Sequence, residues 1–217
     1  LRQEWMQGGD IPRTVEMPDF PPVPSRARRD VWMILQPFDR EVAEVLAILA
    51  RAATREELAA ALDCDPRLLS RSLRKLLDLE LVTAHGKGGP RTFRLAAVED
   101  RENLLERARP ARVRRIHRRT AAFLKAYPNP APRDLENLTR HLLASGRSGE
   151  RRSTEARSTA LRAARLLRAD QSFDRAVRLL EECCAREKTP CIRLELAEEI
   201  SDILEETGDH ERGIAAL

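Results

Sequence analysis

The sequence predicts a mainly α-helical fold, in which a winged helix-turn-helix with a small β-hairpin is followed by an α-helical solenoid of the tetratricopeptide type. Three observations lead to this fold class. Only 4% of the residues are aromatic while 42% are hydrophobic, so the core must consist of Leu, Ala, Val and Ile, as in packed helices. Three amphipathic segments precede a pair of strand-like segments with a glycine-rich tip. The last third of the chain repeats a helix-turn-helix plan.

The N-terminal stretch predicts little regular structure. Residues 1–7 have the pattern of a helix tail, which a Gly-Gly pair closes. Five prolines between positions 12 and 24 remove backbone donors, so we expect an extended connector there. A short apolar helix follows Ser25 and ends at Pro37.

Three helices come next. The first has Asp39 as its expected cap and an apolar stripe that runs to Leu49. The second begins at Thr54, which with Glu57 fits the capping box, in which each side chain binds the other residue's backbone amide. Together with a third helix and a hairpin, these two helices predict a winged helix-turn-helix.

The third helix and the hairpin complete the predicted winged helix. Asp65 caps this helix, and Pro66 takes its first position, where a missing amide costs nothing. The segments LVTAH and RTFRL, joined by residues 86–90, predict a β-hairpin. The expected buried face of the third helix consists of Leu68, Leu69, Leu73, Leu76 and Leu77.

Three further helices are expected between the hairpin and the repeats. Two are separated at Pro110, and the third covers about 133–146 behind a proline-rich linker. His117 and His141 fall on the apolar faces of the second and third of these helices. We interpret them as core histidines rather than catalysts.

The C-terminal part predicts helical repeats. Aligning FDRAVRLL with HERGIAAL places Ala176 over Gly213, a period of 37 residues, close to the tetratricopeptide length of about 34. Such arrays need about three units, and the chain ends inside an apparent helix, so we expect a piece of a longer protein.

Composition excludes several classes of function. The 39 Lys and Arg are nearly balanced by 35 Asp and Glu, and only four of the former are lysine, so the charge of +4 says little about nucleic acid. No apolar stretch approaches the roughly 18 residues of a membrane span, and we expect a soluble, cytoplasmic chain without a membrane partner. The four cysteines lack C-x-x-C spacing, and no nucleophile has a base at motif spacing, so we expect neither a metal site nor an enzyme.

The order of these parts resembles the region that follows the nucleotide-binding module in signal-transduction ATPases with numerous domains, the STAND class. LRQEWMQGG corresponds to the tail of a lid helix, VPSRARRDVWMIL to the lead-in, RTFRL to the wing strand and ARVRRIHRRTAAFL to the basic helix. The resemblance implies four regions. They are a lid-helix tail with a Pro-rich connector (1–28), a winged-helix domain (29–98), a basic helical linker region (99–149) and tetratricopeptide-like repeats (150–217).

The resemblance has one departure. Such families often place a nucleotide-sensing histidine directly after the Phe-Arg of the wing strand, whereas Leu95 occupies that place here. The chain also lacks a G-x-x-x-x-G-K-[ST] loop. We therefore expect no cofactor in this chain, with ATP or ADP and Mg²⁺ confined to an upstream module.

Two basic surfaces are the candidate interaction sites. The first comprises Arg67, Arg71, Arg74, Lys75, Lys87 and Arg91, on the third helix and the wing. The second comprises Arg112, Arg114, Arg115, Arg118 and Arg119, on the basic helix. Residues 101–127 carry a net charge of +7 and residues 181–211 a net charge of −8, so these segments are expected to attract each other or complementary partners.

The sequence therefore predicts a regulatory segment that relays between an upstream ATPase module in cis and a helical-repeat sensor that binds protein partners. Homo-oligomerisation of the longer protein is a further expectation. Two alternatives remain open. One is a transcription regulator that places the third helix on DNA, the less favoured partner, and the other is a scaffold of repeats that does not switch.

Overall fold

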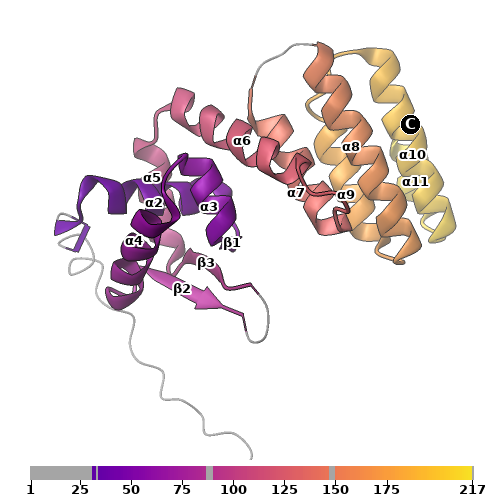
Figure 1. Ribbon diagram of the computed structural model, residues 1–217. Helices are drawn as coiled ribbons and strands as arrows, with labels where there is room; N and C mark the ends of the chain where they lie inside the picture. Colours follow the sequence, from indigo (N-terminus) through magenta and orange to yellow (C-terminus); the bar gives the residue numbers. More distant parts are fainter. Residues whose placement is uncertain (1–30, 33, 87–89, 147–149, 217) are drawn as a thin grey trace, which may run out of the picture. The chain divides into compact units, whose positions relative to one another are not determined.

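The computed structural model describes residues 31–32, 34–86, 90–146 and 150–216 (Figure 1). The expected N-terminal connector and Lys87 lie outside these residues. The chain divides into two compact units, Leu1–Leu35 and Gln36–Leu217, and the description below concerns the second.

Helix α2 (Pro37–Leu49) begins three residues before the expected position. Gln36 is the N-cap and Pro37 the first helical residue, so this proline starts a helix as well as limiting the preceding one. Asp39, the predicted cap, instead lies in the first turn, where its Oδ2 accepts a hydrogen bond from the Gln36 amide at 3.3 Å. The carboxylate also accepts from Ser72 and Lys75 of another helix.

Two further helices and three strands follow. Helix α3 (Arg55–Leu62) and helix α4 (Pro66–Asp78) begin where the sequence predicts, with Thr54 and Asp65 as capping residues. Strands β2 (Val82–His85) and β3 (Thr92–Leu95) confirm the β-hairpin. A two-residue strand, β1 (Ala53–Thr54), was not predicted, and it pairs with β3 to give an antiparallel sheet of order β1-β3-β2.

Two sequence predictions for this part were wrong at one residue each. Leu68, expected in the core, is 47% exposed, whereas Ser72 on the same helix is buried because it donates to Asp39. Thr54 accepts from the Glu57 amide as expected, but the Glu57 carboxylate turns away to bind Arg51. Thr54 therefore caps α3 as the capping-box pattern predicts, whereas Glu57 forms a buried ion pair in place of the second capping hydrogen bond.

The connecting helices are α5 (Val98–Arg107), α6 (Pro110–Lys125) and α7 (Pro132–Ala144). Their boundaries confirm the predicted break at Pro110. One apolar cluster joins α6, α7 and the next helix, through Ala121, Leu124, Leu138, Leu142 and Ala156.

The repeat region contains α8 (Glu150–Ala169), α9 (Phe173–Cys184), α10 (Pro190–Glu206) and α11 (His210–Ala216), which pack in sequence against one another (Figure 1). Two turns repeat at an offset of 37 residues. The Ser172 amide donates to the Leu167 carbonyl at 2.8 Å, and the Asp209 amide to the Leu204 carbonyl at 2.9 Å. The predicted period is therefore present in the backbone, and the fold is mainly helical with a small sheet and a helical-repeat region.

Candidate interaction surfaces

Helix α4 presents the first predicted basic surface. Arg67, Arg71 and Arg74 are exposed on it. Lys75 differs from them because its Nζ lies 2.7 Å from Asp39 Oδ2, so its charge is used inside the fold. Burial raises the pKa of Asp39, but hydrogen bonds from Lys75 and Ser72 outweigh burial and hold that pKa below its usual value.

The hairpin contributes one described cation to the same side. Arg91 is exposed just before β3, and its guanidinium carbon lies 5.8 Å from the centre of the Phe93 ring. Phe93 pairs with Ala53 on one side and Ala84 on the other, so it occupies the central strand of the sheet. The sheet thus fixes the place of Arg91 relative to α4.

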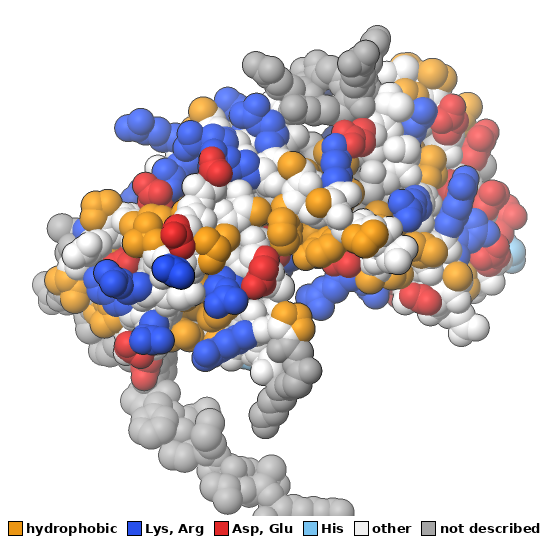
Figure 2. All heavy atoms as spheres, in the orientation of Figure 1, with side chains coloured by type: hydrophobic (Ala, Val, Ile, Leu, Met, Phe, Trp, Pro, Cys, Tyr) orange, Lys and Arg blue, Asp and Glu red, His pale blue; other side chains and the backbone are white. Residues whose placement is uncertain are grey.

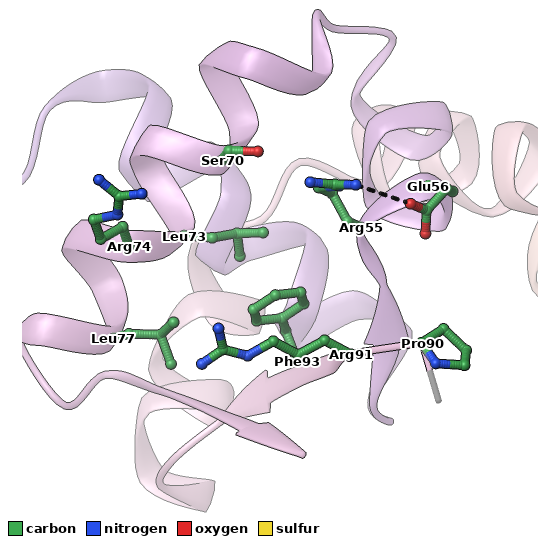
Figure 3. Close-up of a pocket in the computed structure, with 9 residues that line it drawn as sticks. All are labelled: Arg55, Glu56, Ser70, Leu73, Arg74, Leu77, Pro90, Arg91 and Phe93. Atoms are coloured by element: carbon green, nitrogen blue, oxygen red, sulfur yellow. Dashed lines mark hydrogen bonds and ion pairs between the residues drawn. The ribbon is translucent and has the colours of Figure 1, made fainter. Parts of the chain in front are cut away.

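A groove of about 400 Å³ separates α4 from β3 (Figure 3). Leu73 and Leu77 point into it from α4, opposite Phe93 of β3. Arg55, at the start of α3, and Arg91 extend into the same space. The remaining lining residues are Glu56, Ser70, Arg74 and Pro90.

The basic helix α6 divides into two groups of arginines. Arg112 forms ion pairs with Glu44 at 2.8 Å and with Glu41 at 3.4 Å, both on α2. Arg119 forms an ion pair with Asp63 at 2.7 Å and donates to the Leu62 carbonyl at 3.2 Å. These two arginines therefore fasten α6 to the helices that precede it.

The other three arginines of α6 face outward. Arg114, Arg115 and Arg118 are exposed, and within the described residues none of them forms an ion pair. Lys and Arg side chains gather in the upper left of Figure 2, over the region of α6. Only this part of the predicted basic helix is open to a partner.

The described ion pairs do not join the two oppositely charged segments. Those of α6 run to Glu41, Glu44, Asp63 and Glu155. Carboxylates of the acidic segment pair instead with arginines of α7, α8 and α11, which are Arg140, Arg157, Arg168 and Arg212. The repeats thus satisfy much of their own charge.

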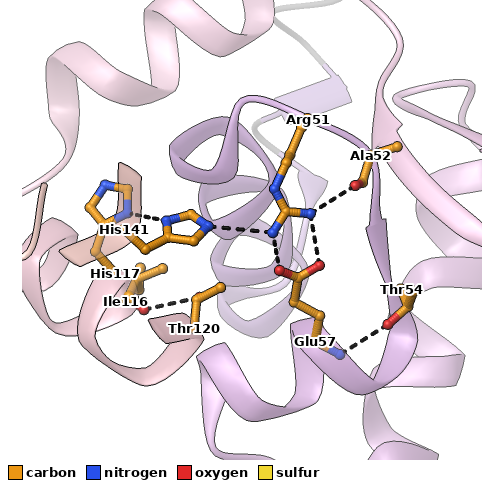
Figure 4. Close-up of polar contacts among 8 residues, drawn as sticks. All are labelled: Arg51, Ala52, Thr54, Glu57, Ile116, His117, Thr120 and His141. Carbon is orange, nitrogen blue, oxygen red and sulfur yellow. Dashed lines mark hydrogen bonds and ion pairs between the residues drawn. The ribbon is translucent and has the colours of Figure 1, made fainter. Parts of the chain in front are cut away.

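A polar cluster between the N-terminal helices and α7 was missed by the sequence analysis (Figure 4). Arg51 binds both oxygens of Glu57, whose side chain is almost fully buried. Arg51 Nη2, which also binds Glu57, lies 3.4 Å from His141 Nε2. His141 Nδ1 in turn lies 2.8 Å from His117 Nδ1.

The histidines of this cluster are strongly perturbed. Burial, with a smaller contribution from Arg186, lowers the pKa of His117 to about 4. Burial, followed by the charges of Arg51 and other cations, lowers the pKa of His141 to about 3. Both imidazoles are therefore neutral near pH 7.

In the described part of the chain, no group of three or more His, Cys, Asp or Glu side chains is arranged to hold a metal ion. The four cysteines are free thiols, and burial raises the pKa of Cys183 to about 11, which suppresses its reactive thiolate. None of the described helices has the length and apolar character needed to cross a bilayer.

No family model and no curated protein matches this chain. Among solved structures, it is similar to the crystal structure of a Signal Transduction ATPase with Numerous Domains (STAND) protein with a tetratricopeptide repeat sensor, from Pyrococcus horikoshii. The two share 16% identity with a TM-score of 0.47, over 89% of this chain and 33% of the other. This chain thus spans about a third of that protein's length.

Proposed function

We propose that this chain is a regulatory, protein-interaction segment of a signal-transduction ATPase, in which a winged-helix module is coupled to helical repeats through α6 and α7. The order α2-β1-α3-α4-β2-β3, with β3 central in the sheet, supports a winged helix-turn-helix assignment for this module. The consecutive helix pairs α8–α9 and α10–α11 support a repeat that binds protein partners.

The position of α7 carries this proposal. Leu135 of α7 packs in the core of α8, α9 and α10, and Glu136 binds Arg175 of α9. Six residues after Leu135, His141 contacts Arg51, which follows α2. Helix α7 therefore contributes both to the core of the repeats and to the polar cluster around Arg51 of the winged-helix module. A displacement of the repeats would for this reason also displace the residues around Arg51.

The relay works by exchanging contacts. A partner that binds the repeats would favour one arrangement of α6 and α7, and the winged-helix module would follow and change its contact with an upstream nucleotide-binding module. ATP or ADP and Mg²⁺ belong to that upstream module in this proposal. The described residues of this chain supply positions and charges, and no bond-making step.

The test uses the longest natural protein that contains this chain. Arg51→Met and His141→Asn each break the contact between α7 and the module, so we expect either change to alter the rate of nucleotide hydrolysis several-fold. Arg107→Met is the matched control, because Arg107 is an exposed arginine in the last turn of α5, outside the polar cluster and the candidate surfaces. A full-length protein that hydrolyses no nucleotide, or one whose rate is the same in all three variants, would exclude the relay.

A second candidate function is DNA binding, and the exposure of Arg67, Arg71 and Arg74 along α4 favours it. In a winged helix this face can enter the major groove while the wing contacts phosphates. Titration of duplex DNA by fluorescence anisotropy over a salt series decides the matter. Binding tighter than about 1 μM at physiological salt that is lost in Arg71→Glu/Arg74→Glu supports DNA, and weaker binding excludes it.

A further inference from the structure

We propose that the groove between α4 and β3 binds a segment of a partner protein in which an apolar side chain is flanked by carboxylates. The proposal concerns residues outside the cluster around Arg51, so it holds whether or not the chain relays a signal. The groove also differs from the basic surface predicted from the sequence. Its ligand is selected by the apolar floor of the groove as well as by the positive charge of the rim.

The floor of the groove is apolar and fixed. Leu73 is 2% exposed and Phe93 6%, so each is anchored in the core and presents only an edge to the groove. Leu77 is half-buried beside them and Pro90 is exposed at the rim. An apolar side chain that entered from solvent would be removed from water against preformed carbon surface.

The rim of the groove is positively charged. Arg55, Arg74 and Arg91 line it, against the single carboxylate of Glu56. The pair between Arg55 and Glu56 is 3.5 Å long and both side chains are more than half exposed, so it holds neither group firmly. Carboxylates on either side of an apolar anchor would meet three guanidinium groups, which bind carboxylates with paired hydrogen bonds.

The geometry favours such a peptide over nucleic acid. Duplex DNA offers phosphates to arginines, but its sugar–phosphate backbone has no protruding apolar side chain that could insert into a recess lined by Leu73, Leu77 and Phe93. The cation–π contact also places the Arg91 guanidinium over Phe93, beside this recess. Charge and apolar surface are thus presented together, as they are in peptide-binding grooves.

The experiment selects ligands from a random 12-residue peptide library displayed on phage, with the purified chain as target. The Arg55→Glu/Arg91→Glu variant serves for subtraction. We expect the enriched peptides to carry Asp or Glu around an aromatic or branched apolar residue. Their affinity is then measured by fluorescence anisotropy with synthetic peptides.

Two groove variants and one control test the location of binding. Arg55→Glu/Arg91→Glu reverses the rim charge, and Ser70→Trp fills the groove without a change of charge, so each is expected to weaken peptide binding at least about tenfold. Arg115→Glu/Arg118→Glu makes the same charge change on α6 and should leave binding unchanged. Circular dichroism and the melting temperature verify that each variant folds.

Three outcomes would overturn the proposal. The first is a selection that enriches no groove-dependent peptide. The second is a set of peptides that lacks either the acidic or the apolar component. The third is a 20-base-pair duplex that binds the wild-type chain tighter than about 1 μM and displaces the peptide, which would assign the groove to DNA.

Discussion

His117 Nδ1 lies 2.8 Å from His141 Nδ1, a separation at which one imidazole must donate and the other accept. Arg51 determines which imidazole donates, because its guanidinium can only donate and faces His141 Nε2 at 3.4 Å. His141 therefore accepts at Nε2 and carries its proton on Nδ1, and His117 accepts at Nδ1 and carries its proton on Nε2. The pair is ordered by an arginine 90 residues away in the sequence.

The first prediction is a loss of stability below neutral pH. The pKa of His117 is lowered to about 4 and that of His141 to about 3, both below the ordinary value near 6.5. The unfolded chain therefore binds more protons than the folded one as the pH falls below about 6.5. We expect the free energy of unfolding, measured in urea, to fall by about 3 kcal/mol between pH 7 and pH 5.

The double variant His117→Leu/His141→Leu isolates this effect. It removes both partners together, so no buried donor is left unpaired between them, and most of the fall in stability should disappear. His85→Asn is the control, because His85 is exposed on β2. A wild-type stability that stays constant from pH 7 to pH 5 would contradict the assignment of both buried imidazoles as neutral in the folded chain.

The second prediction compares two neighbouring arginine–glutamate pairs. Arg51→Met leaves the Glu57 carboxylate, 4% exposed, without its bidentate partner, and should lower the free energy of unfolding by about 3 kcal/mol. Arg55→Met removes the partner of the exposed Glu56 and should cost less than about 0.5 kcal/mol. Chemical denaturation at pH 7 measures both, and equal losses would show that burial does not distinguish the pairs.

The third prediction separates Lys75 from the arginines predicted beside it. Lys75→Met leaves Asp39, 6% exposed, with fewer donors, and should cost about 1 to 2 kcal/mol because the Lys75 side chain is itself partly exposed. Arg71→Met changes an exposed position of the same helix and should stay within about 0.5 kcal/mol. Thermal unfolding monitored by circular dichroism gives both values. If Lys75→Met left the stability unchanged, Lys75 would belong with the exposed arginines of α4 and not with the residues that stabilise the fold.

Local signals in the sequence were sufficient for most element boundaries. Asp65 with Pro66 marked the start of α4, and the glycine-rich tip marked the hairpin, because capping and turn preferences act within a few residues. Strand β1 escaped prediction because two residues carry no period, and only their pairing with β3 makes them a strand.

Contacts between distant residues could not be predicted in the same way. The sequence gives no sign that Arg51 faces His141, or that Arg112 and Arg119 turn inward while Arg115 and Arg118 turn out. Helical periodicity identifies a face, but the neighbour of that face depends on how α6 crosses α2 and α3. The predicted interaction sites were therefore a mixture of surface arginines and arginines that hold the fold together.

The fourth prediction uses the repeat as its own control. Gln171 and Gly208, one period apart, occupy the same turn position with φ of 57° and 77°. Only glycine adopts this left-handed conformation without a Cβ penalty, so Gln171→Gly should stabilise the chain by up to about 1 kcal/mol. Gly208→Ala should destabilise it by about 1 kcal/mol, because a Cβ there meets no other atom and only the backbone strain acts.

Replacing Gly213 by alanine should have the opposite effect on stability to replacing Gly208 by alanine. Gly213 lies inside α11 and aligns with Ala176, and a Cβ built on it would lie 3.4 Å from Ser201 Oγ, an ordinary contact. Gly213→Ala should therefore stabilise the chain by up to about 1 kcal/mol, since alanine is the better helix former and the space exists. Urea denaturation of all three variants tests the alignment: a destabilising Gly213→Ala beside a neutral Gly208→Ala would mean that the 37-residue period does not describe equivalent environments.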